Sequence, residues 1–147
     1  MKARIGELLI KEKRITVAQL EQALIYQKVN GGRLGLNLVK LGFIKEEEIL
    51  GMLSTIYGVA SINLARFEIA PDVLRLIRGE TANRYQIVPL AKRGTTLTIA
   101  TTDPTNEYAL DDIKFLTGFD VEPILASDEA MANAIAKYYP SSAAGSV

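Results

Sequence analysis

Apolar side chains follow two different periods along the 147-residue chain, and the period changes near Gly58. Before this glycine they recur every three to four residues, which is the spacing of amphipathic helices. The stripe that contains Leu20 and Leu24 predicts a helix near 16–28, and a similar stripe predicts a helix near 45–57. We therefore expect the first part of the chain to be mostly helical.

Polar residues mark the starts of these helices. Thr16 and Gln19 have the spacing of a capping box, in which two side chains satisfy free amides at a helix start. The acidic run 46–48 lies where carboxylates favour the start of the next helix. The segment 30–32, Asn-Gly-Gly, is a flexible break between them. The pattern predicts two helical segments, one on each side of this break.

After Gly58 the pattern mixes alternating and helical spacing. Strands are predicted at 86–92, 95–101 and 121–125, and helices at 71–77, 103–117 and 127–138. The first two strands form a hairpin around Arg93-Gly94. The resulting order, α-β-β-α-β-α, is that of a small α+β unit.

These elements give an α+β fold class with three parts. We expect a helical unit at 1–58, packed on an α+β unit at 59–140. Residues 141–147 are Ser, Ala, Gly and Val, which is typical of a linker or a tail.

An internal repeat lies within the helical unit. Arg4-Ile5-Gly6 and Arg33-Leu34-Gly35 begin two stretches, 4–27 and 33–56, that match at a constant offset of 29 residues (33 − 4). A fixed period with matching apolar positions means that one supersecondary unit, a short helix, a turn and a longer helix, is used twice. Two such units side by side form a surface with pseudo-two-fold symmetry, which suits a two-fold symmetric ligand.

The Arg-x-Gly pattern has two interpretations. As a site, glycine lets a ligand approach the backbone, arginine lies over a purine or forks onto a phosphate, and the pairs Leu9-Ile10 and Leu38-Val39 wall a flat base. As structure alone, the pattern caps a helical repeat and the two leucines are core residues. The repetition of the pattern favours a site more than a single copy would, and both interpretations stay open on the residues alone.

Composition limits the chemistry. Lys and Arg number 17 and so do Asp and Glu, so no overall field draws the chain to nucleic acid. Cys and His are absent, which excludes disulfides, Cys or His metal sites and imidazole-based catalysis. We expect a cytoplasmic protein, because the amino terminus lacks a signal-peptide pattern and the uncharged stretch 49–65 is too polar for a membrane span.

Two other groups of residues have a structural and a functional interpretation. Tyr138-Tyr139 could stack on a base, but its helical position beside Ile135 favours packing. The acidic runs 46–48 and 111–112 could be metal ligands, but consecutive acids on a helix diverge in direction, which favours a solvated helix face. We therefore expect no metal site.

The tandem motif resembles a known family. The same order of positions occurs twice, in 4–27 and in 33–56, separated by a five-residue spacer, 28–32. Each copy has Arg, an apolar residue, Gly and an apolar pair, followed by positions for Leu and Gln. This layout resembles the cyclic di-GMP-binding, MshE-type form of the amino-terminal domain of type II secretion and type IV pilus assembly ATPases, the GspE family. The segments 57–64, 83–90, 97–104 and 134–139 resemble the same domain, so the resemblance extends nearly to Pro140.

The resemblance implies a set of cyclic di-GMP-binding residues. In the first motif they are Arg4, Ile5, Gly6, Leu9, Ile10 and Gln27; in the second they are Arg33, Leu34, Gly35, Leu38, Val39 and Gly42. Two positions depart from the family pattern. Lys13 stands where glycine is expected, in a left-handed turn that costs a side chain energy, and Ile56 replaces the second glutamine. Both departures predict weakened or lost binding.

The expected function follows from this set. The chain lacks a G-x-x-x-x-G-K-[ST] loop, so we expect a regulatory and docking domain that is not an enzyme and holds no cofactor. The family implies three partners: cyclic di-GMP, the cytoplasmic domain of an inner-membrane secretion or pilus protein, and an ATPase motor domain if one follows. The alternative is a protein-docking module or stand-alone adaptor that has lost nucleotide binding.

Overall fold

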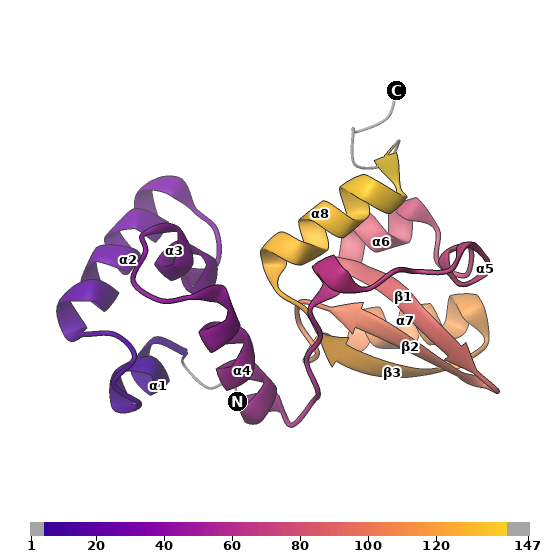
Figure 1. Cartoon of the computed structure of the whole chain (residues 1–147), viewed down its shortest axis with the longest axis horizontal. Coiled ribbons are helices and arrows are strands. Elements are labelled where there is room, and N and C mark those ends of the chain that lie inside the picture. The colour runs from indigo at the N-terminus through magenta and orange to yellow at the C-terminus, as the bar shows by residue number, and fades with distance from the viewer. Residues whose placement is uncertain (1–4, 141–147) are drawn as a thin grey trace. The chain divides into compact units, whose positions relative to one another are not determined.

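Most helices and strands form where the hydrophobic pattern predicts them, and the elements fall into two units. The computed structural model describes residues 5–140; Arg4 and the predicted tail 141–147 lie outside this part. The chain divides into Met1–Ile56 and Tyr57–Val147, each with its own packed interior. Each unit is described by itself (Figure 1).

The first unit consists of four helices. They are α1 Ile5–Lys11, α2 Val17–Asn30, α3 Leu34–Lys40 and α4 Glu46–Tyr57. The repeat is visible in their bounds, because α1 and α3 have 7 residues each and α2 and α4 begin at equivalent positions. The buried core takes equivalent residues from both copies: Leu9 and Leu38, Ile15 and Ile44, with Ala23 and Ile49.

The predicted capping box is present at the start of α2. The Thr16 side chain accepts a hydrogen bond from the Gln19 amide at 3.1 Å, and the Gln19 side chain accepts one from the Thr16 amide at 2.9 Å. At the start of α4 half of this arrangement is kept, since the Glu48 side chain accepts from the Lys45 amide at 3.3 Å. Lysine has no oxygen with which to complete the box.

The second unit is built on a three-stranded sheet. Its elements are η1 Leu64–Arg66, α5 Pro71–Leu74, α6 Gly79–Tyr85, β1 Ile87–Arg93, β2 Thr96–Thr101, α7 Glu107–Thr117, β3 Asp120–Leu125 and α8 Asp128–Tyr138. The strand order is β1-β2-β3; β1 pairs antiparallel with β2, and β2 pairs parallel with β3 through the α7 crossover. This arrangement confirms the α+β fold class and the hairpin.

The sheet has a hydrophobic core on each face. Successive side chains of a strand point to opposite faces, so Ile87 packs with Ile113 of α7 whereas Val88 packs with Met131 of α8. Helices therefore cover both sides of the sheet. Both edge strands contain a proline: Pro89 lies in β1, next to a register shift, and Pro123 lies in β3.

The second unit contains one helix that was not predicted, and two predicted helices have different bounds. Helix α6 was not expected. The helix predicted over 103–117 begins at Glu107 because the Asn106 side chain caps it, and Asp103 instead accepts bonds from Thr105. The helix predicted over 71–77 ends at Leu74.

Within residues 5–140, each helix is too short or too polar to cross a bilayer. In the same range no three Asp or Glu side chains are grouped as a metal site would require.

Candidate functional site

The turns that end α1 and α3 are equivalent in backbone and hydrogen bonding. Lys13 has φ 59° and Gly42 has φ 78°, so both lie in the left-handed region. The next amide bonds back to the helix in each copy: Arg14 to the Leu9 carbonyl at 2.8 Å, and Phe43 to the Leu38 carbonyl at 3.0 Å. These are the bonds of a Schellman motif. The predicted left-handed turn at Lys13 is confirmed.

The glycines of the two motifs lie inside α1 and α3 and face the second helix of their own repeat. A Cβ on Gly6 would come within 2.8 Å of a Leu20 methyl group. A Cβ on Gly35 would meet Ile49, the equivalent residue, at 3.5 Å. The structure therefore gives these glycines a packing role, tighter in the first repeat. Close approach of a ligand to them stays a prediction.

The apolar pairs of the two motifs divide between core and surface. Leu9 and Leu38 are fully buried, with 0% exposure, so neither side chain reaches solvent. Ile10 and Val39 are half-buried at the edge of the same core. Of each pair, only the second residue is thus available to wall a base. Ile5 and Leu34 are half-buried as well.

The structure describes only one of the two motif arginines, Arg33. Arg4 lies outside the described residues. Arg33 is exposed at the start of α3, where its backbone is extended with φ −82° and ψ 145°. It is therefore the residue that immediately precedes the first turn of α3.

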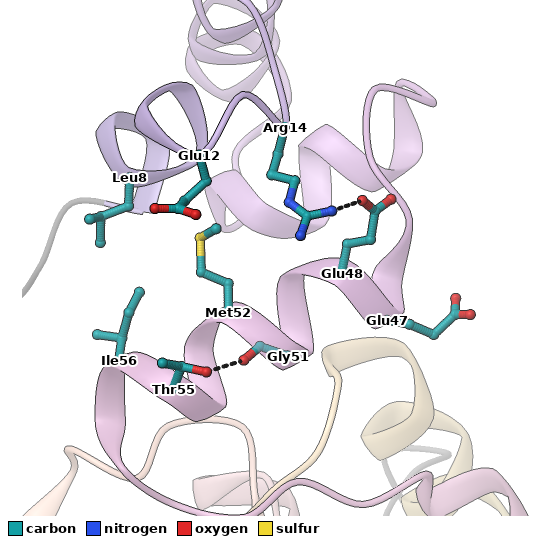
Figure 2. A pocket seen from close by; sticks show the side chains of 9 residues that line it. All are labelled: Leu8, Glu12, Arg14, Glu47, Glu48, Gly51, Met52, Thr55 and Ile56. Atoms are coloured by element: carbon teal, nitrogen blue, oxygen red, sulfur yellow. Dashed lines mark hydrogen bonds and ion pairs between the residues drawn. The ribbon is translucent and has the colours of Figure 1, made fainter.

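Gln27 lies next to the segment that leads into the second motif. Its side-chain nitrogen donates to the Gly32 carbonyl at 2.9 Å, and its backbone carbonyl accepts from the Gly31 amide at 2.7 Å. The structure thus brings Gln27 close to the residue before Arg33. The equivalent residue of the second repeat, Ile56, lies in a pocket between α1 and α4 (Figure 2).

The sequence analysis missed a buried amide in the second repeat. Asn37 is 1% exposed, and its side-chain nitrogen donates to the Gly31 carbonyl at 3.0 Å. Asn37 therefore holds the spacer between the two motifs, residues 28–32, against α3. The signal was present in the alignment of the repeats, because the equivalent residue is the apolar Leu8.

The tyrosine pair at the end of α8 serves packing, as predicted. The Tyr138 hydroxyl accepts a hydrogen bond from the Ile69 amide at 3.1 Å. The Tyr139 hydroxyl donates to the Leu74 and Ile77 carbonyls at 3.1 and 2.9 Å, and burial raises the pKa of Tyr139 to about 12. Both hydroxyls thus hold the segment before β1.

One member of the acidic pair at 111–112 is engaged in structure, whereas Asp111 is exposed. Asp112 accepts a hydrogen bond from the Tyr85 hydroxyl at 2.8 Å. That bond, together with desolvation, raises the pKa of Tyr85. Asp112 therefore links α7 to the end of α6.

Comparison with known proteins places this geometry in a family. The family model of the MshEN domain matches residues 57–145. The chain belongs to the MshEN domain family. It is an amino-terminal domain of the GspE type, and the tandem motif lies before the segment that the family model covers.

Relatives of this MshEN domain include pilus assembly ATPases. Over 95% of its length it is 43% identical to the type IV pilus assembly ATPase PilB of Myxococcus xanthus, of which it covers 25%. It is 30% identical to PilB of Thermus thermophilus over 93% of its length, covering 16% of that protein. The chain therefore spans a quarter or less of these two relatives.

Two solved structures have the same fold. A structure of MshE with cdg matches 94% of this chain and 100% of its own, with a TM-score of 0.74 and 32% identity. The amino-terminal domain of XpsE matches 95% of this chain and 99% of its own, with a TM-score of 0.68 and 18% identity. The first match includes the tandem-motif helices, since it spans almost the whole chain.

Proposed function

We propose that this MshEN domain is the regulatory and docking part of a type IV pilus or type II secretion ATPase, and that its first unit binds cyclic di-GMP. The observation that carries the proposal is the 29-residue repeat, whose two turns share the same backbone bonds. A pseudo-two-fold scaffold suits a ligand with two equal halves. The 32% identity to MshE, whose structure contains cdg, supports the same ligand.

The proposed site combines both motifs. Arginine contributes by stacking on guanine or by a charge-assisted bond to phosphate. The half-buried residues Ile10 and Val39 face the bases, and Gln27 adds an amide beside the spacer. The full set is Arg4, Ile5, Gly6, Leu9, Ile10, Gln27, Arg33, Leu34, Gly35, Leu38, Val39 and Gly42, in which Leu9 and Leu38 act by holding the helices in place.

Calorimetry with cyclic di-GMP tests the proposal. We expect one ligand per chain and no comparable binding of GTP, GMP or cyclic AMP, because only cyclic di-GMP offers two guanines to two motifs. Arg33→Ala should weaken binding at least several-fold, since a charge-assisted hydrogen bond contributes about 1.5–3 kcal/mol. The matched control is Arg75→Ala, which removes an exposed arginine from the second unit.

The alternative function is docking alone. It is favoured by Lys13 and Ile56, which replace the glycine and glutamine of the family pattern. If the chain binds no cyclic di-GMP, and Lys13→Gly combined with Ile56→Gln restores none, the repeat is structural and the nucleotide proposal is wrong.

The docking role has further parts. We propose a cytoplasmic domain that carries no catalysis of its own, joins a motor domain, and contacts the cytoplasmic part of an inner-membrane protein through residues 59–140. Hydrolysis of ATP or GTP by the purified chain above a buffer control, persisting through further purification, would contradict the non-catalytic role. The proposed division at residues 58 and 140 is tested by limited proteolysis, with the first stable fragments expected to end there.

A further inference from the structure

Helix α2 carries an apolar stripe on its solvent side. Four large side chains of this helix are between 45% and 78% exposed: Val17, Leu24, Ile25 and Val29. They are four of the seven large hydrophobic residues that are exposed among residues 5–140, and the other three lie on α7. Residues seven positions apart share one face of a helix, so Val17 and Leu24 lie in line and Ile25 lies beside them. Such a concentration of apolar side chains on one face is typical of an interaction surface.

The repeat shows that the fold does not require this stripe. In the second repeat, Ser54 stands at the position of Ile25 and Gly58 at that of Val29. Both repeats nonetheless form a long second helix, α2 and α4. The core of the first unit also contains neither Ile25 nor Val29. Packing within the unit therefore does not account for the stripe.

Two opposite charges lie within the stripe. Glu21 and Lys28 are exposed and seven residues apart, so they lie on one face of α2, about 10 Å apart along its axis. In the part of the chain that the structure describes, neither side chain takes part in an ion pair. Leu24 and Ile25 lie between them. The face therefore has an acid at one end, a base at the other and two aliphatic side chains in the middle.

This face is complementary to itself under a two-fold rotation. If two α2 helices pack antiparallel about a point midway between Leu24 and Ile25, these two residues meet across the contact (24 + 25 = 49). Glu21 then meets Lys28 of the second copy, because the same sum applies (21 + 28 = 49). Each contact occurs twice, as in any two-fold interface. We propose that the α2 face docks a second copy of this chain in this antiparallel arrangement.

Charge determines the direction of the pair and the helix that forms it. In a parallel pair, Glu21 would face Glu21 and Lys28 would face Lys28, and such like-charge contacts disfavour the arrangement. A pair of α7 helices is disfavoured as well, because its exposed Tyr108 and Phe115 are accompanied by the two aspartates at 111–112. A second copy of α7 would bring these carboxylates together. Of the two helices with exposed apolar side chains, α2 is the one that suits a second copy.

The contact is separate from the cyclic di-GMP site proposed above. Gln27 is the one residue of α2 in that site, and its side chain is bonded to Gly32 of the spacer. None of the residues that form the proposed contact belongs to the cyclic di-GMP set. The two proposals can therefore fail independently.

Sedimentation of the whole chain over a range of concentrations tests the proposal. The contact uses about six side chains from each copy, fewer than the roughly 20–30 of a standard interface, so we expect a dimer that dissociates on dilution. Amide NMR signals of α2 around Glu21 and Ile25 should shift with concentration, and those of α4 should not. A monomer at every concentration up to about 1 mM, which corresponds to a Kd weaker than specific association requires, would overturn the proposal. Shifts centred on α4 or on the second unit would overturn it as well.

Charge reversal tests the antiparallel arrangement. Glu21→Lys and Lys28→Glu should each weaken the dimer about tenfold, because two like-charge contacts replace two ion pairs. Mixed in equal amounts, the two variants should form a heterodimer about as tight as the parent dimer, since each new charge then meets its opposite in the other chain. Continued loss of association in this mixture would contradict the proposal.

A control separates this register from overall charge. Glu68→Lys makes the same change of charge at an exposed position of the second unit and should dimerise as the parent chain does. Mixed with Lys28→Glu, it matches the net charges of the first mixture but restores only one of the two contacts, so the heterodimer should be weaker. Equally tight heterodimers in the two mixtures would reduce the effect to net charge and overturn the proposed contact.

A substitution in the apolar centre tests the same surface without reversing an ion pair. Ile25→Asp should weaken the dimer at least tenfold while the unit stays folded, because the side chain is exposed and outside the core. Leu116→Asp, at an exposed leucine of α7, is the matched control and should dimerise as the parent does. Unchanged dimerisation by Ile25→Asp would contradict the proposal. Cyclic di-GMP should bind Ile25→Asp as it binds the parent chain, and a difference would contradict the separation of the two sites.

Discussion

The two halves of the first unit share a backbone and differ in the side chains that surround it. Both halves end their short helix in a left-handed turn, with the same hydrogen bond returning to the helix. Yet one half has Lys13 at the turn and the other has Gly42. A helix pair of this kind is therefore specified by a few apolar positions and one turn, which leaves the remaining positions free to diverge in function.

The largest expected effect tests whether the two halves share one core. Leu9→Ala and Leu38→Ala should each lower the free energy of unfolding of the first unit by about 2–5 kcal/mol, because both side chains are fully buried. Urea titration followed by NMR signals of α1 to α4 measures this. Val29→Ala, at a residue that is 78% exposed, should cost little. A large loss at one leucine and a negligible loss at the other would show that the halves do not contribute equally.

The left-handed turns give the next effect. Lys13→Gly should stabilise the first unit by about 1 kcal/mol and Gly42→Lys should destabilise it by a similar amount, since a left-handed conformation costs a side chain roughly 1–2 kcal/mol. Thermal unfolding of the two variants measures the difference. Lys28→Gly is the control, because inside α2 the same exchange should destabilise. A destabilising Lys13→Gly would mean that the lysine side chain makes compensating contacts.

Helix capping distinguishes the halves by a smaller amount. Thr16→Ala should cost about 1 kcal/mol, since it removes the capping box of α2. Lys45→Thr should gain up to about 1 kcal/mol by completing the box with Glu48. Urea unfolding of both variants checks the opposite signs. A loss in Lys45→Thr would show that the second turn does not place its threonine as the first does.

The glutamine difference should change ligand affinity least. Gln27→Ile should weaken cyclic di-GMP binding and Ile56→Gln should tighten it, each by about 0.5–1.5 kcal/mol, the net contribution of one hydrogen bond. Calorimetry of the two variants tests the pair. Gln22→Ile, the same exchange at an exposed position of α2, is the control. Equal weakening by Gln22→Ile would assign the effect to the helix rather than to the site.

Periodicity predicted the helices and strands best where apolar spacing and turn residues agree. The helix expected near 45–57 is α4, Glu46–Tyr57, and the strand expected at 95–101 is β2, Thr96–Thr101. Helix α6 was missed because Gly79 begins it and Ala82 is its only fully buried residue among those described. A helix held by so few apolar contacts has no stripe in the sequence.

The site was harder to predict because it depends on contacts between segments. The sequence shows the two motifs, but it does not show that Leu9 and Leu38 point into the core while Ile10 and Val39 stay at its edge. Nor does it show the hydrogen bond from Gln27 in α2 to Gly32, the last residue of the flexible break. The residues of the pocket gave no motif, because their shared feature is a place between α1 and α4.

The prolines at the two edges of the sheet restrict how other chains can meet the second unit. Pro89 and Pro123 each interrupt the row of backbone donors on an outer strand, because proline has no amide hydrogen. An additional strand laid along either edge would lose a hydrogen bond midway, and the end of β3 is already paired with the chain's own Ser61. Both features disfavour sheet extension by a partner and edge-to-edge aggregation between copies. Recognition of the second unit is thereby directed to side chains on its helices and loops.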